Sequence, residues 1–218
     1  MKKVGSGVMV AVAALFALSG LAMAADTAVG DPYSLDHCVM SGKKFAEGST
    51  PVVVSHSGRE IKFCCDGCKG KFEADPAAVL SKVDKEMIEQ QKKSYPLDTC
   101  LVEGGKLEAG KAVDYVYNNR LVRLCCDGCK EKIAADPAKY IGELDKAVIK
   151  AQEATYALKT CPVSGEELGS MGDPVKMVVA NQLVELCCKG CTKKVTADPA
   201  KYLSMIHPAG AATVEKKN

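Results

Sequence analysis

Twelve cysteines, all that the chain contains, fall into three sets with nearly the same spacing. Each set reads C-x25-CC-x2-C, or x24 in the second set. The members are Cys38, Cys64, Cys65 and Cys68; Cys100, Cys125, Cys126 and Cys129; Cys161, Cys187, Cys188 and Cys191. Thiolates are soft ligands that suit zinc or copper(I), and a Cys-x-x-Cys pair turns both sulfurs toward one point. The pattern therefore predicts three thiolate metal sites that use all twelve cysteines.

Two other kinds of thiol chemistry fit the same residues. An even number of cysteines in an exported chain is also typical of a disulfide framework, in which Cys38 would pair with Cys64 or Cys65. Such a chain would be a structural or protein-interaction array. A Cys-x-x-Cys element between a strand and a helix also occurs in thiol–disulfide oxidoreductases.

Nothing else in the sequence indicates catalysis. It has no repeated carboxylate pair, no Ser-His-Asp pattern and no glycine-rich phosphate loop. Asp75, Asp136 and Asp198 do recur, but each stands before a proline, where a helix cap accounts for it. We therefore expect a binding protein and no enzyme.

The cysteine sets belong to a longer internal repeat of about 61 residues, since the cysteine pairs begin at positions 64, 125 and 187. Between the first cysteine and the pair, each repeat alternates apolar and polar residues around a short turn, which predicts a β-hairpin. The turns are Ser57-Gly58, Asn118-Asn119 and Ala180-Asn181. We expect Gly67, Gly128 and Gly190, inside the C-C-x-x-C element, to adopt a positive φ.

Helices should position the last cysteine of each set and join the repeats. A short helix is expected at the Cys-x-x-Cys element, and Ala-Asp-Pro marks the start of a longer one. The first two longer helices should reach about Lys93 and Thr155. With 5% aromatic residues and no Trp, one large core is improbable. The predicted fold is α+β: three small ββα, treble-clef-like cysteine modules in tandem, joined by helices.

The first 24 residues have the features of a cleavable signal peptide. Lys2 and Lys3 precede an apolar run, and Ala22-Met23-Ala24 fits a signal peptidase site, with the cut after Ala24. A periplasmic or secreted location follows as the expectation. Without Lys2 and Lys3, the 29 basic residues become 27, equal to the 27 acidic ones. This balance argues against nucleic acid, and against a membrane surface after cleavage, as partners.

The repeat resembles the YHS domain and the related TRASH domain. The shared elements are "CPVSG" at 161–165, "FCCDGC" at 63–68 and "LCCKGC" at 186–191, followed by "KFEADP" at 71–76 or "ADPAKY" at 197–202. The resemblance implies a treble-clef-like module that traffics, sequesters or senses heavy metals, together with an envelope metal-handling partner. It places the ligands at the first, second and fourth cysteine of each set, so that Cys65, Cys126 and Cys188 are additional.

The chain is accordingly divided as follows: signal peptide 1–24, YHS/TRASH-like repeats at 33–94, 95–155 and 156–207, and a polar tail at 208–218.

Overall fold

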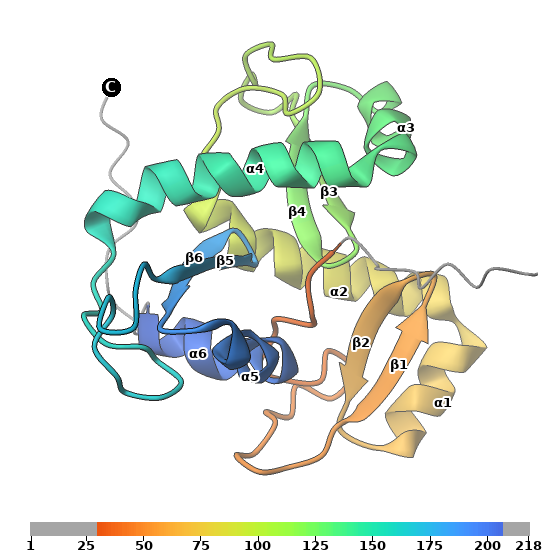
Figure 1. Cartoon of the computed structure of the whole chain (residues 1–218). Coiled ribbons are helices and arrows are strands. Elements are labelled where there is room, and N and C mark those ends of the chain that lie inside the picture. The colour runs from red at the N-terminus through yellow and green to blue at the C-terminus, as the bar shows by residue number, and fades with distance from the viewer. Residues whose placement is uncertain (1–29, 207–218) are drawn as a thin grey trace, which may run out of the picture.

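The computed structural model describes residues 30–206, so the expected signal peptide and polar tail lie outside the described residues. The fold is α+β and consists of three tandem modules, each a β-hairpin followed by helices (Figure 1). This confirms the fold class predicted from the repeat. The described part contains no helix that is both long and apolar enough to cross a membrane.

Each hairpin is an antiparallel pair of five-residue strands whose register is set by a two-residue turn. The strands are β1 (Val52–His56), β2 (Arg59–Phe63), β3 (Val113–Tyr117), β4 (Arg120–Leu124), β5 (Val175–Val179) and β6 (Gln182–Leu186). The predicted turns are confirmed, and their residues Ser57, Gly58, Asn118, Asn119, Ala180 and Asn181 all have positive φ. This backbone suits glycine and asparagine, and it matches the twist of a tight hairpin.

Two helical segments follow each hairpin. They are α1 (Asp66–Ala74) and α2 (Pro76–Gln91), α3 (Gly128–Ala135) and α4 (Pro137–Gln152), and α5 (Thr192–Ala197) and α6 (Pro199–Ile206). Short 3₁₀ turns are η1 (Lys92–Ser94), η2 (Glu153–Thr155) and η3 (Lys189–Cys191).

The second helix of each module begins as predicted. The Asp75 carboxylate accepts a hydrogen bond from the backbone N–H of Ala78 at 3.0 Å, and Asp136 and Asp198 cap α4 and α6 in the same way. The apolar face of α2 is buried through Val79, Val83 and Met87. These side chains join Phe63 and Phe72 in a separate small core, and the other two modules have equivalent cores.

The expectation of positive φ at Gly67, Gly128 and Gly190 is wrong, because these glycines lie within helical turns. A Cβ at Gly67 would lie 3.8 Å from the Sγ atom of Cys65, which is an ordinary van der Waals contact, and the spacing at the other two glycines is similar. The structure therefore shows no steric requirement for glycine at these positions.

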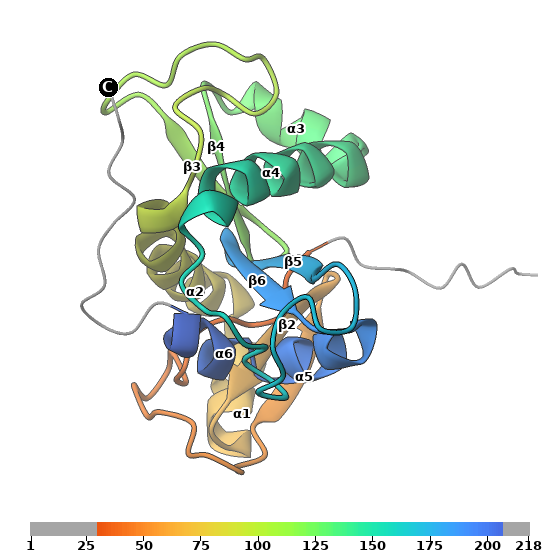
Figure 2. The same ribbon diagram turned by 60° about the vertical axis from the view of Figure 1, so that its left-hand side comes forward.

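The long helix of one module packs against the hairpin of the next. Helix α2 contacts β3 and β4, and α4 contacts β5 and β6. Figures 1 and 2 show α2 and α4 passing between successive hairpins, whose turns point toward the middle of the molecule. The modules are therefore packed together and are not independent units on a string.

Buried polar side chains fix the interface between the first and second modules. Gln91, at the end of α2, donates to the carbonyl of Asn119 at 2.7 Å and accepts from the N–H of Leu121 at 2.8 Å. The Asn119 carboxamide oxygen accepts from Arg59 at 2.6 Å, and Arg59 also pairs with Asp84 on α2. One hydrogen-bond network thereby links helix α2, strand β2 and the turn of the second hairpin.

The second interface repeats the first. Gln152, at the end of α4, donates to the Asn181 carbonyl at 2.9 Å and accepts from the N–H of Leu183 at 2.8 Å. Arg120 donates to the Asn181 side chain at 3.1 Å and pairs with Asp145 at 2.8 Å. The two outer modules lack one half of this arrangement. Gly58 holds the asparagine position in the first hairpin, and Gln182 holds the arginine position in the third.

The segment before the first module contacts both later modules. The side chain of Asp31 is buried, and its carboxylate lies 2.9 Å from the Nε atom of Arg120 while accepting a hydrogen bond from the backbone N–H of Ala180. Its own N–H donates to the carbonyl of Asn118 at 2.8 Å. In addition, Lys62 of the first module donates to a carbonyl at the end of α5 at 2.8 Å. All three modules are therefore in contact.

Candidate metal centres

Three local features bring the cysteines of the first module together. Cys38 begins a tight turn, in which the N–H of Gly42 donates to the Cys38 carbonyl at 2.8 Å and Gly42 has a φ of 68°. Cys64 directly follows β2, and Cys68 lies in the first turn of α1. The second and third modules repeat this construction with equivalent turns at Gly104 and Gly165.

Each module brings its first, second and fourth cysteine into one cluster, in which the sulfur atoms lie within 4.8 Å of one another. The clusters are Cys38, Cys64 and Cys68; Cys100, Cys125 and Cys129; Cys161, Cys187 and Cys191. The last two sulfurs of each cluster are 3.8 Å apart. With zinc–sulfur bonds of about 2.3 Å, the edge of a tetrahedral thiolate site is about 3.8 Å. The clusters therefore have the dimensions of a soft-metal site.

The additional cysteine of each module lies at the edge of its cluster. Cys65 is 3.8 Å from Cys64, Cys126 is 3.7 Å from Cys129, and Cys188 is 3.8 Å from Cys191, measured between sulfur atoms. Cys65 and Cys126 are exposed and Cys188 is half-buried. The prediction that these three thiols are ligands stays a prediction.

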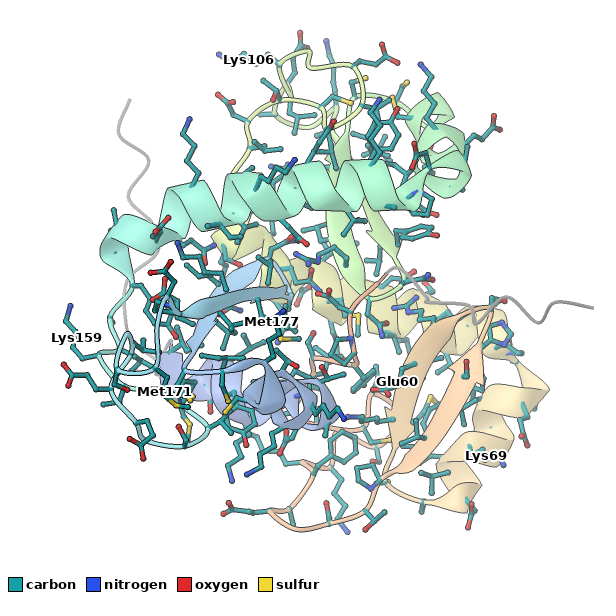
Figure 3. All side chains as sticks on the ribbon, viewed as in Figure 1. Glu60, Lys69, Lys106, Lys159, Met171 and Met177 are labelled. Atoms are coloured by element: carbon teal, nitrogen blue, oxygen red, sulfur yellow. The ribbon has the colours of Figure 1, made fainter. Side chains whose placement is uncertain are left out.

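The clusters lie at the outer ends of the hairpins. Each draws its cysteines from one repeat, so no cluster shares a residue across a repeat boundary. Lys69 and Lys106 lie near the first and second clusters in sequence. Figure 3 shows both lysines toward the outside of the molecule, whereas Glu60 lies nearer the middle. The modules thus hold three separate candidate sites.

The first and last cysteines of each cluster differ in acidity. Burial acts to raise the pKa of Cys38, but hydrogen bonds from the backbone at Cys64 and from Ser41 lower it to about 7. The pKa of Cys161 is lowered to about 6, because hydrogen bonds from the backbone at Cys187 and from Ser164 outweigh the effect of burial. Burial and the neighbouring thiols raise the pKa of Cys68 and Cys191 to about 12. Ion binding would therefore have to displace the proton of the last cysteine.

Sequence reasoning missed the side chains that contact the sulfurs. The Ser41 hydroxyl lies 3.3 Å from the Cys64 sulfur, and the Ser164 hydroxyl lies 3.3 Å from the Cys187 sulfur. The second module has Glu103 at this position, paired with Lys132 on α3. An alignment of the three turns already shows this difference: the first and third read "VMSG" and "PVSG", with serine before the glycine, whereas the second reads "LVEG", with glutamate there.

Comparisons of the chain with protein-family models, with curated proteins and with solved structures give no match. The structure thus supports the repeated module and its cysteine clusters, without assigning them to a family.

Proposed function

We propose that this chain is an exported heavy-metal-binding protein that buffers, carries or sequesters zinc or copper(I) through three thiolate sites. The observation that carries the proposal is the threefold cysteine cluster, with sulfur atoms at the separation of a tetrahedral metal site. The natural stoichiometry is one ion per module. No reaction is required of the protein, because thiolates that wrap an ion bind it without further chemistry.

The cellular setting of this proposal rests on sequence. The N-terminal sequence favours export to the periplasm or outside, and the likeness of the repeat to YHS and TRASH domains favours heavy-metal handling. Another envelope metal-handling protein would then donate or receive the ion. The even charge balance of the mature chain favours neither nucleic acid nor a membrane surface as a partner.

Native mass spectrometry of the protein, isolated from its own envelope without added reductant, tests the proposal. The expected result is a mass increase of up to three metal ions, lost on acidification because protons compete for the thiolates. The ion masses would identify the metal. A reduced protein that binds neither zinc nor copper above background would overturn the proposal.

The same spectrum tests the disulfide alternative. All twelve cysteines are free thiols in the structure, and the nearest sulfur pairs are 3.7 Å apart or more. A disulfide bond requires about 2.05 Å. A metal-free mass lowered by about 2 Da for each pair of cysteines would instead indicate a disulfide-stapled array. Insulin-reduction activity with reversible dithiol cycling would indicate the oxidoreductase alternative.

A further inference from the structure

The three candidate sites are not equivalent, and the difference lies in the second module. The middle cysteine of its cluster, Cys125, is exposed, whereas Cys64 is half-buried and Cys187 is only 7% exposed. An exposed ligand atom can be reached directly by a competing ligand. Exchange by direct attack should therefore be easiest in the second module.

The second module also lacks the serine contact. In the first and third modules a hydroxyl lies 3.3 Å from the sulfur of this same cysteine. A hydroxyl at that position can donate a hydrogen bond to a thiolate and stabilise its negative charge while it holds an ion. Outer contacts of this kind typically contribute about 10- to 100-fold to metal affinity.

Glu103 cannot replace the hydroxyl. A carboxylate has no proton to donate at neutral pH. Its oxygen pairs with Lys132, and this pairing neutralises the charge that would otherwise attract a cation. The backbone turn is the same in the second and third modules. The backbone N–H groups of Gly104 and Gly165 each donate to the carbonyl of the first cysteine of their cluster at 2.8 Å. The difference therefore resides in one side chain and in the exposure of Cys125.

From these observations we propose that the second module is the exchange site of the protein: it releases its ion first to an external thiol or chelator, while the first and third modules retain theirs. This inference rests on the proposed metal-binding function. It assigns a division of labour to the three sites, with one site for transfer and two for retention.

Zinc-loaded full-length protein tests the inference. A limiting amount of a chelator such as EDTA is added, samples are alkylated with iodoacetamide at successive times, and peptide mapping identifies the cysteines that have become reactive. Alkylation should appear at the cluster cysteines Cys100, Cys125 and Cys129 at least about 10-fold faster than at those of the other two clusters. Equal rates, or slowest alkylation in the second module, would overturn the inference.

Variants at position 103 test the cause. Glu103→Ser restores the hydroxyl and should slow alkylation of the second cluster toward the rate of the third. Glu103→Ala is the matched control, since it also releases Lys132 but supplies no hydrogen-bond donor, and its second cluster should stay fast. Ser164→Ala should accelerate the third cluster. Residue 103 and Ser164 are exposed, so folding is expected to tolerate these changes. Identical rates in the Ser and Ala variants would overturn the role of the hydroxyl.

The outcomes separate this inference from the proposed function. A protein that takes up no zinc before the chelator is added would refute both. Three bound ions that leave at one common rate would refute only the exchange site.

Discussion

At the scale of single residues, each module holds one cysteine beyond its three-cysteine cluster. The sulfur of Cys126 lies 3.7 Å from Cys129 and 3.9 Å from Cys125. Two edges of a tetrahedral thiolate site, each about 3.8 Å, are therefore present, but Cys126 does not belong to the group of sulfurs that all lie within 4.8 Å of one another. The additional cysteines Cys65, Cys126 and Cys188 also have a lowered pKa, because hydrogen bonds from backbone amides and nearby thiols stabilise the thiolate.

A triple serine variant tests this role. With Cys65, Cys126 and Cys188 all replaced by serine, the zinc-loaded protein should still bind up to three ions, since the three-cysteine clusters remain. The number of sulfur neighbours per zinc, measured by X-ray absorption, should fall from four to three. Competition with a chromophoric chelator should show weaker binding. An unchanged sulfur count would show that these cysteines are not ligands.

At the scale of secondary structure elements, the interfaces between modules depend on a few buried amides. Asn181 holds the turn of the third hairpin at a φ of 58° and also bonds to Arg120 and to the Leu121 carbonyl at 3.1 and 3.0 Å. The Asn181 side chain, Arg120 and Leu121 are all buried, so water cannot replace these hydrogen bonds. Removal of the side chain would leave them without a partner.

Asn181→Gly is therefore expected to destabilise the protein by about 1–3 kcal/mol, measured by denaturant unfolding. Glycine accepts the positive φ, so the loss reports the side-chain contacts. Gly58→Asn is the matched control, because the corresponding turn of the first hairpin has no module before it. It should change stability by less than about 0.5 kcal/mol. Equal effects of the two substitutions would argue against the interface role.

A second prediction at this scale concerns pH. Asp114 on β3 accepts from Lys92 at 2.7 Å and from Arg123 at 2.8 Å, so it links the end of α2 to the second hairpin. Burial acts to raise its pKa, but these two bonds lower it below the usual 3.8. A depressed carboxyl pKa stabilises the folded state above the pKa of the unfolded state, and this contribution is lost as pH falls through the folded value.

Asp114→Asn should consequently lower stability at pH 7 by about 0.5–1 kcal/mol, a modest value because both partners are partly exposed. The difference from the wild type should vanish as the pH is lowered below about 4. Denaturant unfolding at a series of pH values measures it. Any acid release of metal affects both proteins, so only their difference reports Asp114. A difference independent of pH would contradict the assignment.

The sequence predicted local elements well and long-range contacts poorly. Turn residues such as Asn181 and helix starts such as Asp75 act on their immediate neighbours, so their roles could be inferred from short segments. Gln91 gave no indication of its role, because its partners belong to the next hairpin. Gly67 was misinterpreted, because it lies in the first turn of α1 and does not adopt a positive φ. The cysteine clusters were predictable because three copies repeat the spacing.

At the scale of the whole molecule, Asp31 connects segments that are far apart in sequence. It precedes the first module, yet its contacts are with Arg120 in the second module and Ala180 in the third. Arg120 is almost completely buried, with a side-chain exposure of 1%. Its charge is therefore balanced by Asp31 together with the half-buried Asp145.

Asp31→Ala should destabilise the whole chain by about 3 kcal/mol, because it leaves a buried guanidinium with only one carboxylate partner. Hydrogen exchange should accelerate at the turns of both the second and third hairpins. Asp173→Ala provides a control with an exposed aspartate and should change stability by less than about 0.5 kcal/mol. Faster exchange confined to residues next to position 31 would contradict the connecting role.

The incomplete outer faces also bear on how such an array could lengthen during evolution. The first repeat carries only the arginine side of the interface and the third only the asparagine side, because Gly58 and Gln182 replace the missing partners. A duplicated end repeat would therefore meet a face that lacks a matching residue. A duplicated second repeat carries both Asn119 and Arg120 and would fit between its neighbours at once. We expect longer relatives of this protein to have gained their extra copies from the middle of the gene.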